Sequence, residues 1–255
     1  MTTDRSALDG AIEDLYRAFA GRPLRRWTDP CLTCCATEEE EAALHAAPLR
    51  QLSVDALSPY AENLTTWGDE RELNHLFPRM FELATQEDYF PIGVETFGTA
   101  ISRARPSWST AEQRAADRAF LELWRAELGA TSPVYQPDEL LCTIGWASDD
   151  LGPHLSSWAS AGTPTATMHL VRLLGFGWDP WRADLDEPFW QTRGDDQFPR
   201  RAQMDQIVAW MLGPDPWRML DAAVERGDEP ADEIEEALLI LTGTIGAARP
   251  QPPRR

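Results

Sequence analysis

Apolar residues recur at intervals of three and four along most of this chain, and this spacing constrains the fold more than any other feature. An early example is the run Leu8, Ile12, Leu15 and Phe19. Such residues fall on one face of an α-helix, and no segment shows the sustained alternation that predicts a strand. We therefore expect an all-α protein of about ten short-to-medium helices, arranged as stacked helical hairpins or as an irregular α-solenoid or bundle.

Capping signals predict where individual helices begin. Ser109 with Glu112 forms a capping-box pattern ahead of a long periodic segment. Asp215 followed by Pro216 combines a preferred cap with a proline at the first helical position. These two signals predict helix starts at residues 109 and 215.

The helical pattern runs through nearly the whole chain without a strong linker. We expect residues 1–247 to form a single all-α domain, in which the only candidate boundary lies near 130–136. The tail at 248–255 is dominated by proline and arginine. We expect this tail to be disordered.

Charge restricts the partners of this protein. Acidic residues outnumber basic ones by 42 to 23, which gives a formal net charge of -19. Such an excess repels phosphate backbones and anionic head groups, so we expect no nucleic acid and no membrane as a partner. A partner protein with a basic surface is compatible with it. The acidic N-terminus lacks an apolar signal core, which predicts a cytoplasmic location.

Three of the four cysteines form a CxxCC sequence, as Cys31, Cys34 and Cys35. A CxxC turn lets two thiolates converge on one soft cation, and a zinc site would take a further ligand from His45 or Cys142. Two other interpretations are open: a buried loop in which cysteine acts as a small apolar residue, and a redox pair. Apart from zinc, no cofactor is expected.

The amphipathic helix around residue 77 combines a candidate core face with a candidate polar site. Phe77 and Phe81 are expected in the core, with His75 and Arg79 on a more polar face and Asp69 at the preceding turn. An imidazole, a guanidinium and a carboxylate can together bind an anion or exchange protons. In the structural alternative, Asp69 caps the helix while Arg79 braces it through hydrogen bonds.

The segment 176–199 has no sustained period and predicts a long loop. It places Trp178, Trp181 and Trp190 among several carboxylates. Aromatic faces beside carboxylates suit a cationic side chain, and exposed tryptophans anchor many protein interfaces. In the alternative interpretation, the rings cover the helical core and the carboxylates face water.

Residues 27–84 resemble a family of bacterial proteins without an established function. The shared features are the cysteine loop, a PLR-L segment at 48–52, a TTWGD turn at 65–69 and an H-F-L-P-R-like helix, which reads HLFPR at 75–79. The resemblance covers about a quarter of the chain. It implies a helical cytosolic protein and implies no activity.

These patterns favour a binding function over catalysis. The chain has no nucleophile with a matching base, no HExxH motif and no glycine loop that would cradle a phosphate. We therefore expect a non-enzymatic protein that binds another protein. A zinc-binding structural or sensing protein that uses the cysteine loop is the alternative, and a hydrolytic enzyme that uses His75 is the third interpretation.

Overall fold

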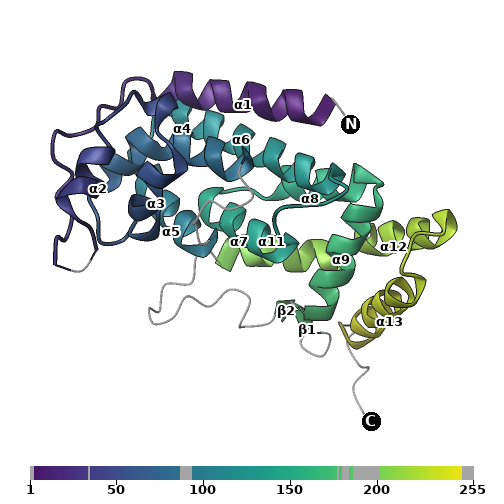
Figure 1. Cartoon of the computed structure of the whole chain (residues 1–255). Helices are drawn as coiled ribbons and strands as arrows, with labels where there is room; N and C mark the ends of the chain where they lie inside the picture. Colours follow the sequence, from purple (N-terminus) through teal and green to yellow (C-terminus); the bar gives the residue numbers. More distant parts are fainter. Residues whose placement is uncertain are drawn as a thin grey trace, which may run out of the picture. The chain divides into compact units, whose positions relative to one another are not determined.

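The structure is a computed structural model that describes residues 3–33, 35–86, 94–176, 178–179, 184–185 and 201–248. These residues form twelve α-helices, two 3-10 helices and one pair of two-residue strands (Figure 1). The expected all-α fold is confirmed, and the number of helices in the described ranges is close to the expected ten. Among the helices described, none is long and apolar enough to cross a membrane. The expected disordered tail lies outside the described residues, except for residue 248.

The chain separates into two compact units. Unit 1 runs up to Leu123 and includes Trp146–Ser148, whereas unit 2 comprises Trp124–Gly145 and the residues from Asp149 onward. The first division falls inside a helix, α6 (Thr110–Gly129). The expected single domain, with a boundary near 130–136, stays a prediction.

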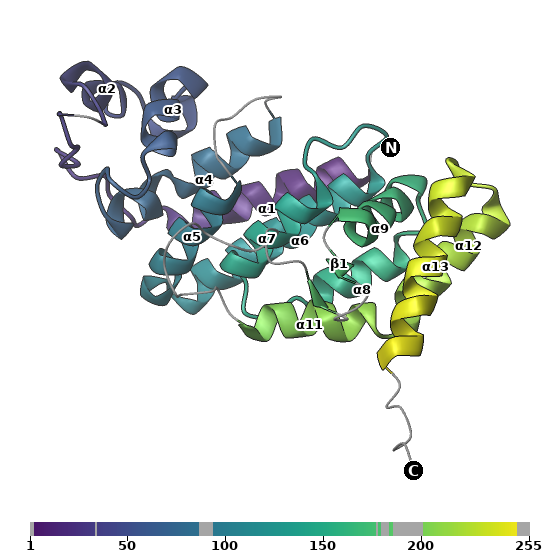
Figure 2. The ribbon, with the colours of Figure 1, turned by 90° about the horizontal axis from the view of Figure 1, so that it is seen from below.

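Unit 1 is built from α1 to α5, the first part of α6 and two 3-10 helices. The bounds are α1 (Thr3–Phe19), α2 (Glu38–Ala43), η1 (Leu49–Gln51), α3 (Val54–Glu62), α4 (Glu70–Gln86), α5 (Val94–Ala104) and η2 (Arg105–Ser107). Helix α4 contacts α1, α3, α5 and η1, and Figures 1 and 2 both show α1 beside it. Helix α4 is therefore the central element of this unit.

Phe77 of α4 lies at the centre of the unit 1 core. Its side chain is fully buried, and its ring centroid lies 5.3 Å from that of Trp108 and 5.4 Å from that of Phe19. Phe81 is also buried, so the predicted core face of this helix is confirmed. Pro78 lies within the helix, which continues through it to Gln86. The aromatic rings thus join α1, α4 and the chain that follows η2.

The predicted capping box is present at the start of α6. The backbone N–H of Ser109 donates to Oε2 of Glu112 at 2.6 Å, and the N–H of Glu112 donates to the Ser109 hydroxyl at 3.3 Å. Glu112 is buried and also accepts two hydrogen bonds from the guanidinium of Arg22, at 2.6 and 2.8 Å. One carboxylate therefore caps α6 and fixes the segment that follows α1.

Unit 2 contains the end of α6, α7 up to Gly145, the helices that follow and a short antiparallel hairpin. The bounds are α7 (Pro137–Ala147), α8 (Gly152–Ala161), α9 (Pro164–Phe176), β1 (Trp178–Asp179), β2 (Asp184–Leu185), α11 (Arg201–Met211), α12 (Pro214–Arg226) and α13 (Ala231–Ala248). Helices α12 and α13 lie side by side, and α13 also packs on α9 (Figure 2). Trp158 is fully buried between Trp124 and Trp210, whose ring centroids lie 5.2 and 5.0 Å away.

The start of α12 differs from the prediction. Gly213 occupies the cap position and Pro214 is the first helical residue, so the helix begins before Asp215 and Pro216. Proline fits the first turn of a helix because the N–H that it lacks has no intrahelical partner there. Pro214 and Pro216 both lie in this turn, so either could have marked the start of the helix. The helix ends at Gly227, whose φ of 72° lies in the left-handed region that favours glycine.

Candidate functional site

The cysteine loop is held by hydrogen bonds of its own backbone. The carbonyl oxygen of Cys31 accepts from the N–H groups of Cys35 and Ala36, at 2.9 and 3.2 Å. Cys31 and Cys35 are half-buried, and Cys34 lies outside the described residues. Of the two cysteines in the CxxC pair that would begin a zinc site, only Cys31 is among the described residues.

His45, one of the two expected further zinc ligands, is exposed and joins a hydrogen-bond network around the buried Glu41. Its Nε2 lies 3.2 Å from Oε1 of Glu41, which also accepts from the backbone N–H of Thr28 at 2.8 Å. The indole N–H of Trp67 lies 2.6 Å from the Thr28 hydroxyl oxygen and 3.2 Å from Oε2 of Glu41. The Thr28 hydroxyl donates to the same carboxylate. This network joins the segment before the cysteines, α2 and the TTWGD turn.

The described residues around the cysteine loop do not complete a zinc site. No group of three His, Cys, Asp or Glu side chains that could hold a metal occurs among the residues that the structure describes. Cys142 is buried in α7 and belongs to unit 2, whereas the cysteine loop belongs to unit 1. Zinc binding by Cys31, Cys34, Cys35 and His45 stays a prediction.

We expect Glu41→Gln to lower the free energy of unfolding by about 2 kcal/mol, because several donors converge on this carboxylate and an amide cannot accept through both of its heavy atoms. Burial alone would raise the pKa of Glu41, but the hydrogen bonds from Thr28, His45 and Trp67 lower it. This stabilisation is therefore present at neutral pH and is lost as the pH falls through the folded pKa. Urea unfolding measures the loss in the free energy of unfolding.

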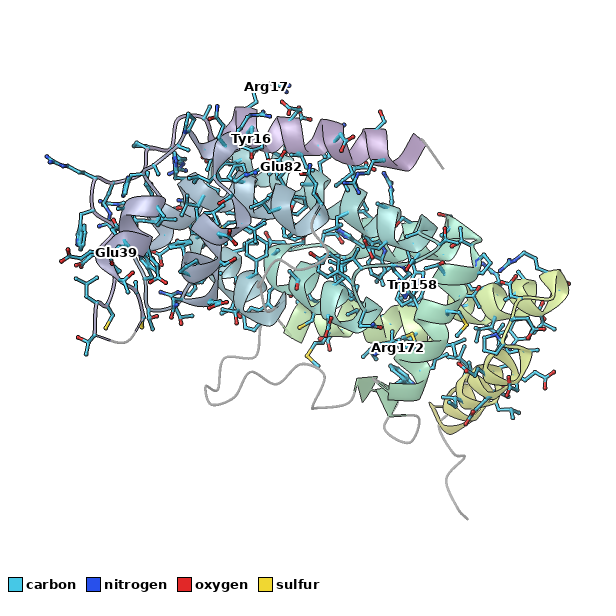
Figure 3. The ribbon with its side chains drawn as sticks, viewed as in Figure 1. Tyr16, Arg17, Glu39, Glu82, Trp158 and Arg172 are labelled. Carbon is cyan, nitrogen blue, oxygen red and sulfur yellow. The ribbon has the colours of Figure 1, made fainter. Side chains whose placement is uncertain are left out.

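The control is Glu39→Gln, at an exposed position on the same helix (Figure 3). Equal unfolding midpoints for Glu41→Gln and Glu39→Gln would contradict the role of the network.

Asp69 lies at the N-terminal end of α4 and acts there as a cap. Its Oδ1 accepts from the N–H of Arg71 at 2.8 Å, and its own N–H donates to Glu72 at 2.9 Å. The buried Glu72 carboxylate also accepts two hydrogen bonds from the Arg25 guanidinium, at 2.5 and 2.7 Å. Two backbone N–H groups at this end of α4 are thus satisfied by carboxylates, as in the structural alternative for Asp69.

His75 and Arg79 follow on α4 and contact different partners. The Nδ1–H of His75 donates to the carbonyl oxygen of Arg22 at 2.5 Å. The guanidinium of Arg79 donates to the carbonyl oxygen of Leu52 at 2.8 Å and to Glu82 at 2.6 Å. His75 and Arg79 therefore fix two different neighbouring segments against α4, and their hydrogen bonds do not join them to Asp69.

His75 also lines a cavity between α1, η1 and α4, which we call the α1–α4 cavity. It has a volume of about 370 Å³, within the range of small-molecule sites. Its lining comprises Glu13, Tyr16, Arg17, Phe19, Ala20, Arg22, Leu49, Arg50, His75 and Pro78. These residues come from three separate stretches of the chain, so no local motif indicated them.

Tyr16 and Arg50 form one wall of the α1–α4 cavity. The guanidinium carbon of Arg50 lies 3.8 Å from the centre of the Tyr16 ring, and two N–H groups of Arg50 donate to Glu13 at 2.6 and 2.7 Å. The Tyr16 hydroxyl donates to Glu82 at 2.5 Å, and Figure 3 shows both side chains. Burial and this hydrogen bond raise the pKa of Tyr16, so its phenol stays protonated at neutral pH.

Trp178 lies in β1 and is buried, with 4% of its surface exposed. Strand β1 pairs with β2 and contacts α9. The Trp178 ring therefore covers the core of unit 2, as in the alternative interpretation of this segment. Trp181 and Trp190 lie outside the described residues.

A second hollow, the α9–α13 groove, lies in unit 2 and has a volume of about 640 Å³. Both helices contribute to it, together with the chain that precedes α7. The lining comprises Pro133, Gln136, Met168, His169, Val171, Arg172, Gly175, Glu233, Glu236, Ala237 and Ile240. Apolar side chains form much of this surface, and two carboxylates lie beside them.

Comparison with known proteins identifies no relative of this chain. Neither a protein-family model, nor a curated protein, nor a solved structure matches it. The resemblance of residues 27–84 to a bacterial family therefore stays a prediction. Any functional assignment rests on the geometry of the two hollows and on charge.

Proposed function

We propose that this chain is a non-enzymatic binding protein whose α9–α13 groove takes a basic, amphipathic segment of a partner protein. The observation that supports this proposal is the combination of apolar and acidic residues in one groove. Met168 and Val171 of α9 face the same hollow as Ala237 of α13, beside the carboxylates of Glu233 and Glu236. An apolar surface with a charged rim is the usual composition of a protein-binding site.

The charge of this region favours a basic partner. The first two turns of α13 carry Asp232, Glu233, Glu235 and Glu236 and no basic residue. Arg172 is the only arginine among the groove residues, against two glutamates. Because the whole chain carries a net charge of -19, its long-range field also attracts a basic partner and raises the association rate.

Exposed apolar side chains lie close to the groove in sequence. Leu239 of α13 is 73% exposed, the largest exposure among the large apolar residues described. It precedes Ile240, a partly exposed residue that lines the groove. A partner protein that extended beyond the groove around α13 could bury this leucine, and each buried apolar side chain of this size contributes about 1.5–3 kcal/mol.

The test begins with capture from a lysate of the native host. The chain contains no lysine, so amine-reactive immobilisation attaches it through its N-terminus alone and leaves the groove exposed. A captured protein is then purified, and its affinity is measured for the parent chain and for two variants. Capture alone does not support the proposal, because it does not locate the binding surface.

We expect Glu233→Gln with Glu236→Gln to weaken binding of the purified partner by about tenfold at low salt, because two carboxylates at the rim are lost. Glu38→Gln with Glu39→Gln is the matched control, since these exposed glutamates in the first turn of α2 change the net charge equally. The control should retain nearly the parental affinity. Equal loss in both variants, or capture of no basic partner, would contradict the proposal.

A further inference from the structure

The α1–α4 cavity brings three arginines together in an otherwise acidic protein. Its ten lining residues include Arg17, Arg22, Arg50 and His75, and each arginine is paired with a carboxylate, of Asp14, Glu112 and Glu13 respectively. The chain as a whole has 42 acidic and 23 basic residues. Arginine forms bidentate hydrogen bonds with phosphate and carboxylate groups, so N–H groups that these ion pairs leave unused are potential donors to an anion.

Two of these arginines are held in place by carboxylates and still have N–H groups to donate. Arg22 donates from Nε and Nη2 to Glu112 and from Nη2 to the carbonyl oxygen of Ser107. Its Nη1 donates to no acceptor among the described residues. Among the described residues, Arg50 donates only to Glu13, from Nη1 and Nη2. A guanidinium has five N–H groups, so both side chains are preorganised and both can donate further.

His75 adds a hydrogen-bonding atom of a different kind. Its Nδ1–H donates to the Arg22 carbonyl oxygen, which fixes the tautomer and leaves Nε2 as an acceptor in the neutral ring. A fully ionised carboxylate offers nothing to such an acceptor. A phosphate monoester has a second pKa of about 6, so near that pH its monoanion offers anionic oxygens to the arginines and one P–OH group to the imidazole.

The rest of the lining is apolar. Phe19, Leu49 and Pro78 contribute side chains that cannot bind a phosphate group. A ligand that carries an organic group on its phosphate would cover them, whereas inorganic phosphate would leave them in contact with water. The volume of about 370 Å³ accommodates a small organic molecule rather than a bare ion.

We infer that the α1–α4 cavity of unit 1 is a binding site for a small phosphate monoester, with Arg22 and Arg50 on the phosphate and the ester group against Leu49 and Pro78. His75 accepts the hydrogen bond from the protonated phosphate oxygen. This site does not depend on the α9–α13 groove, and neither proposal requires the other.

The probes are phenyl phosphate, inorganic phosphate and benzyl alcohol, each titrated calorimetrically into the full chain at about pH 6, where a large share of the monoester is monoanionic. We expect phenyl phosphate to bind with one-to-one stoichiometry, inorganic phosphate to bind more weakly, and benzyl alcohol to give no binding. Arg50→Gln should weaken phenyl phosphate binding by about tenfold, because one charge-assisted hydrogen bond is lost. Circular dichroism of the variant shows whether its fold is retained.

Arg5→Gln is the matched control, because Arg5 lies on α1 outside the cavity and is paired with Asp9 at 3.8 Å in an exposed ion pair. It changes the net charge by the same amount as Arg50→Gln and should retain the parental affinity. No binding of phenyl phosphate would overturn the inference. So would equal affinities for Arg50→Gln and Arg5→Gln, or equally tight binding of phenyl phosphate and benzyl alcohol.

Discussion

Phe77→Ala will lower the free energy of unfolding by about 3–5 kcal/mol, which is the usual cost of truncating a buried aromatic side chain. Phe77 has no exposed surface and lies at the centre of a cluster formed by Phe19, Phe81, Trp108 and Phe120. Because these rings come from α1, α4, α6 and the chain after η2, they cannot all move into the space that is left. The substitution therefore removes apolar contacts and creates a cavity.

The matched control for this substitution is Trp27→Ala. Trp27 also belongs to unit 1, but its side chain is 46% exposed, so removing an even larger ring should cost less than about 1 kcal/mol. Urea unfolding measures both variants against the parent. A Phe77→Ala midpoint equal to that of Trp27→Ala would show that the cluster does not hold unit 1 together.

The helices of this protein could be predicted because their signals are local. The three-and-four spacing that predicted the core face of α4 places Phe77 and Phe81 on its buried side. The Ser109–Glu112 capping box also formed as predicted, since a cap involves residues only three positions apart. The hairpin of β1 and β2 was missed because each strand has only two residues, too few to show alternation.

The candidate site could not be predicted in the same way because its contacts are not local. Glu41 is one of four successive glutamates in the first turn of α2, and acidic residues favour a helix start without indicating which of them turns inward. A rotation of 100° per residue turns Glu41 inward, where it meets Thr28 and Trp67. Likewise, Arg22 and Arg50 reach one cavity from distant positions, and no spacing rule connects them.

His154 will make the stability of the protein depend on pH. This histidine of α8 is 2% exposed, and neither of its ring nitrogens has a hydrogen-bond partner among the described residues. Burial lowers the pKa of His154 to about 4, a shift that Arg125 reinforces and Asp150 opposes. The imidazole is therefore neutral in the folded protein at physiological pH, whereas an exposed histidine has a pKa of about 6.5.

The direction of the effect follows from where the proton binds. Between about pH 6.5 and about pH 4, the unfolded chain takes up a proton at His154 that the folded protein does not. The free energy of unfolding therefore falls as the pH falls through this window. A shift of this size corresponds to a loss of up to about 3 kcal/mol, since each pKa unit is worth about 1.4 kcal/mol.

His154→Leu should remove this part of the pH dependence, because leucine has a similar size and does not titrate. We expect the stability of the variant to exceed that of the parent by an amount that grows from about pH 6.5 to about pH 4. Urea unfolding followed by tryptophan fluorescence measures the difference at each pH. The control is Ser157→Ala on the same helix, whose hydroxyl donates to the His154 carbonyl oxygen at 2.9 Å. Ser157→Ala should change the free energy of unfolding by the same amount at every pH. If His154→Leu also changes it by a constant amount, the pH dependence does not come from protonation of His154.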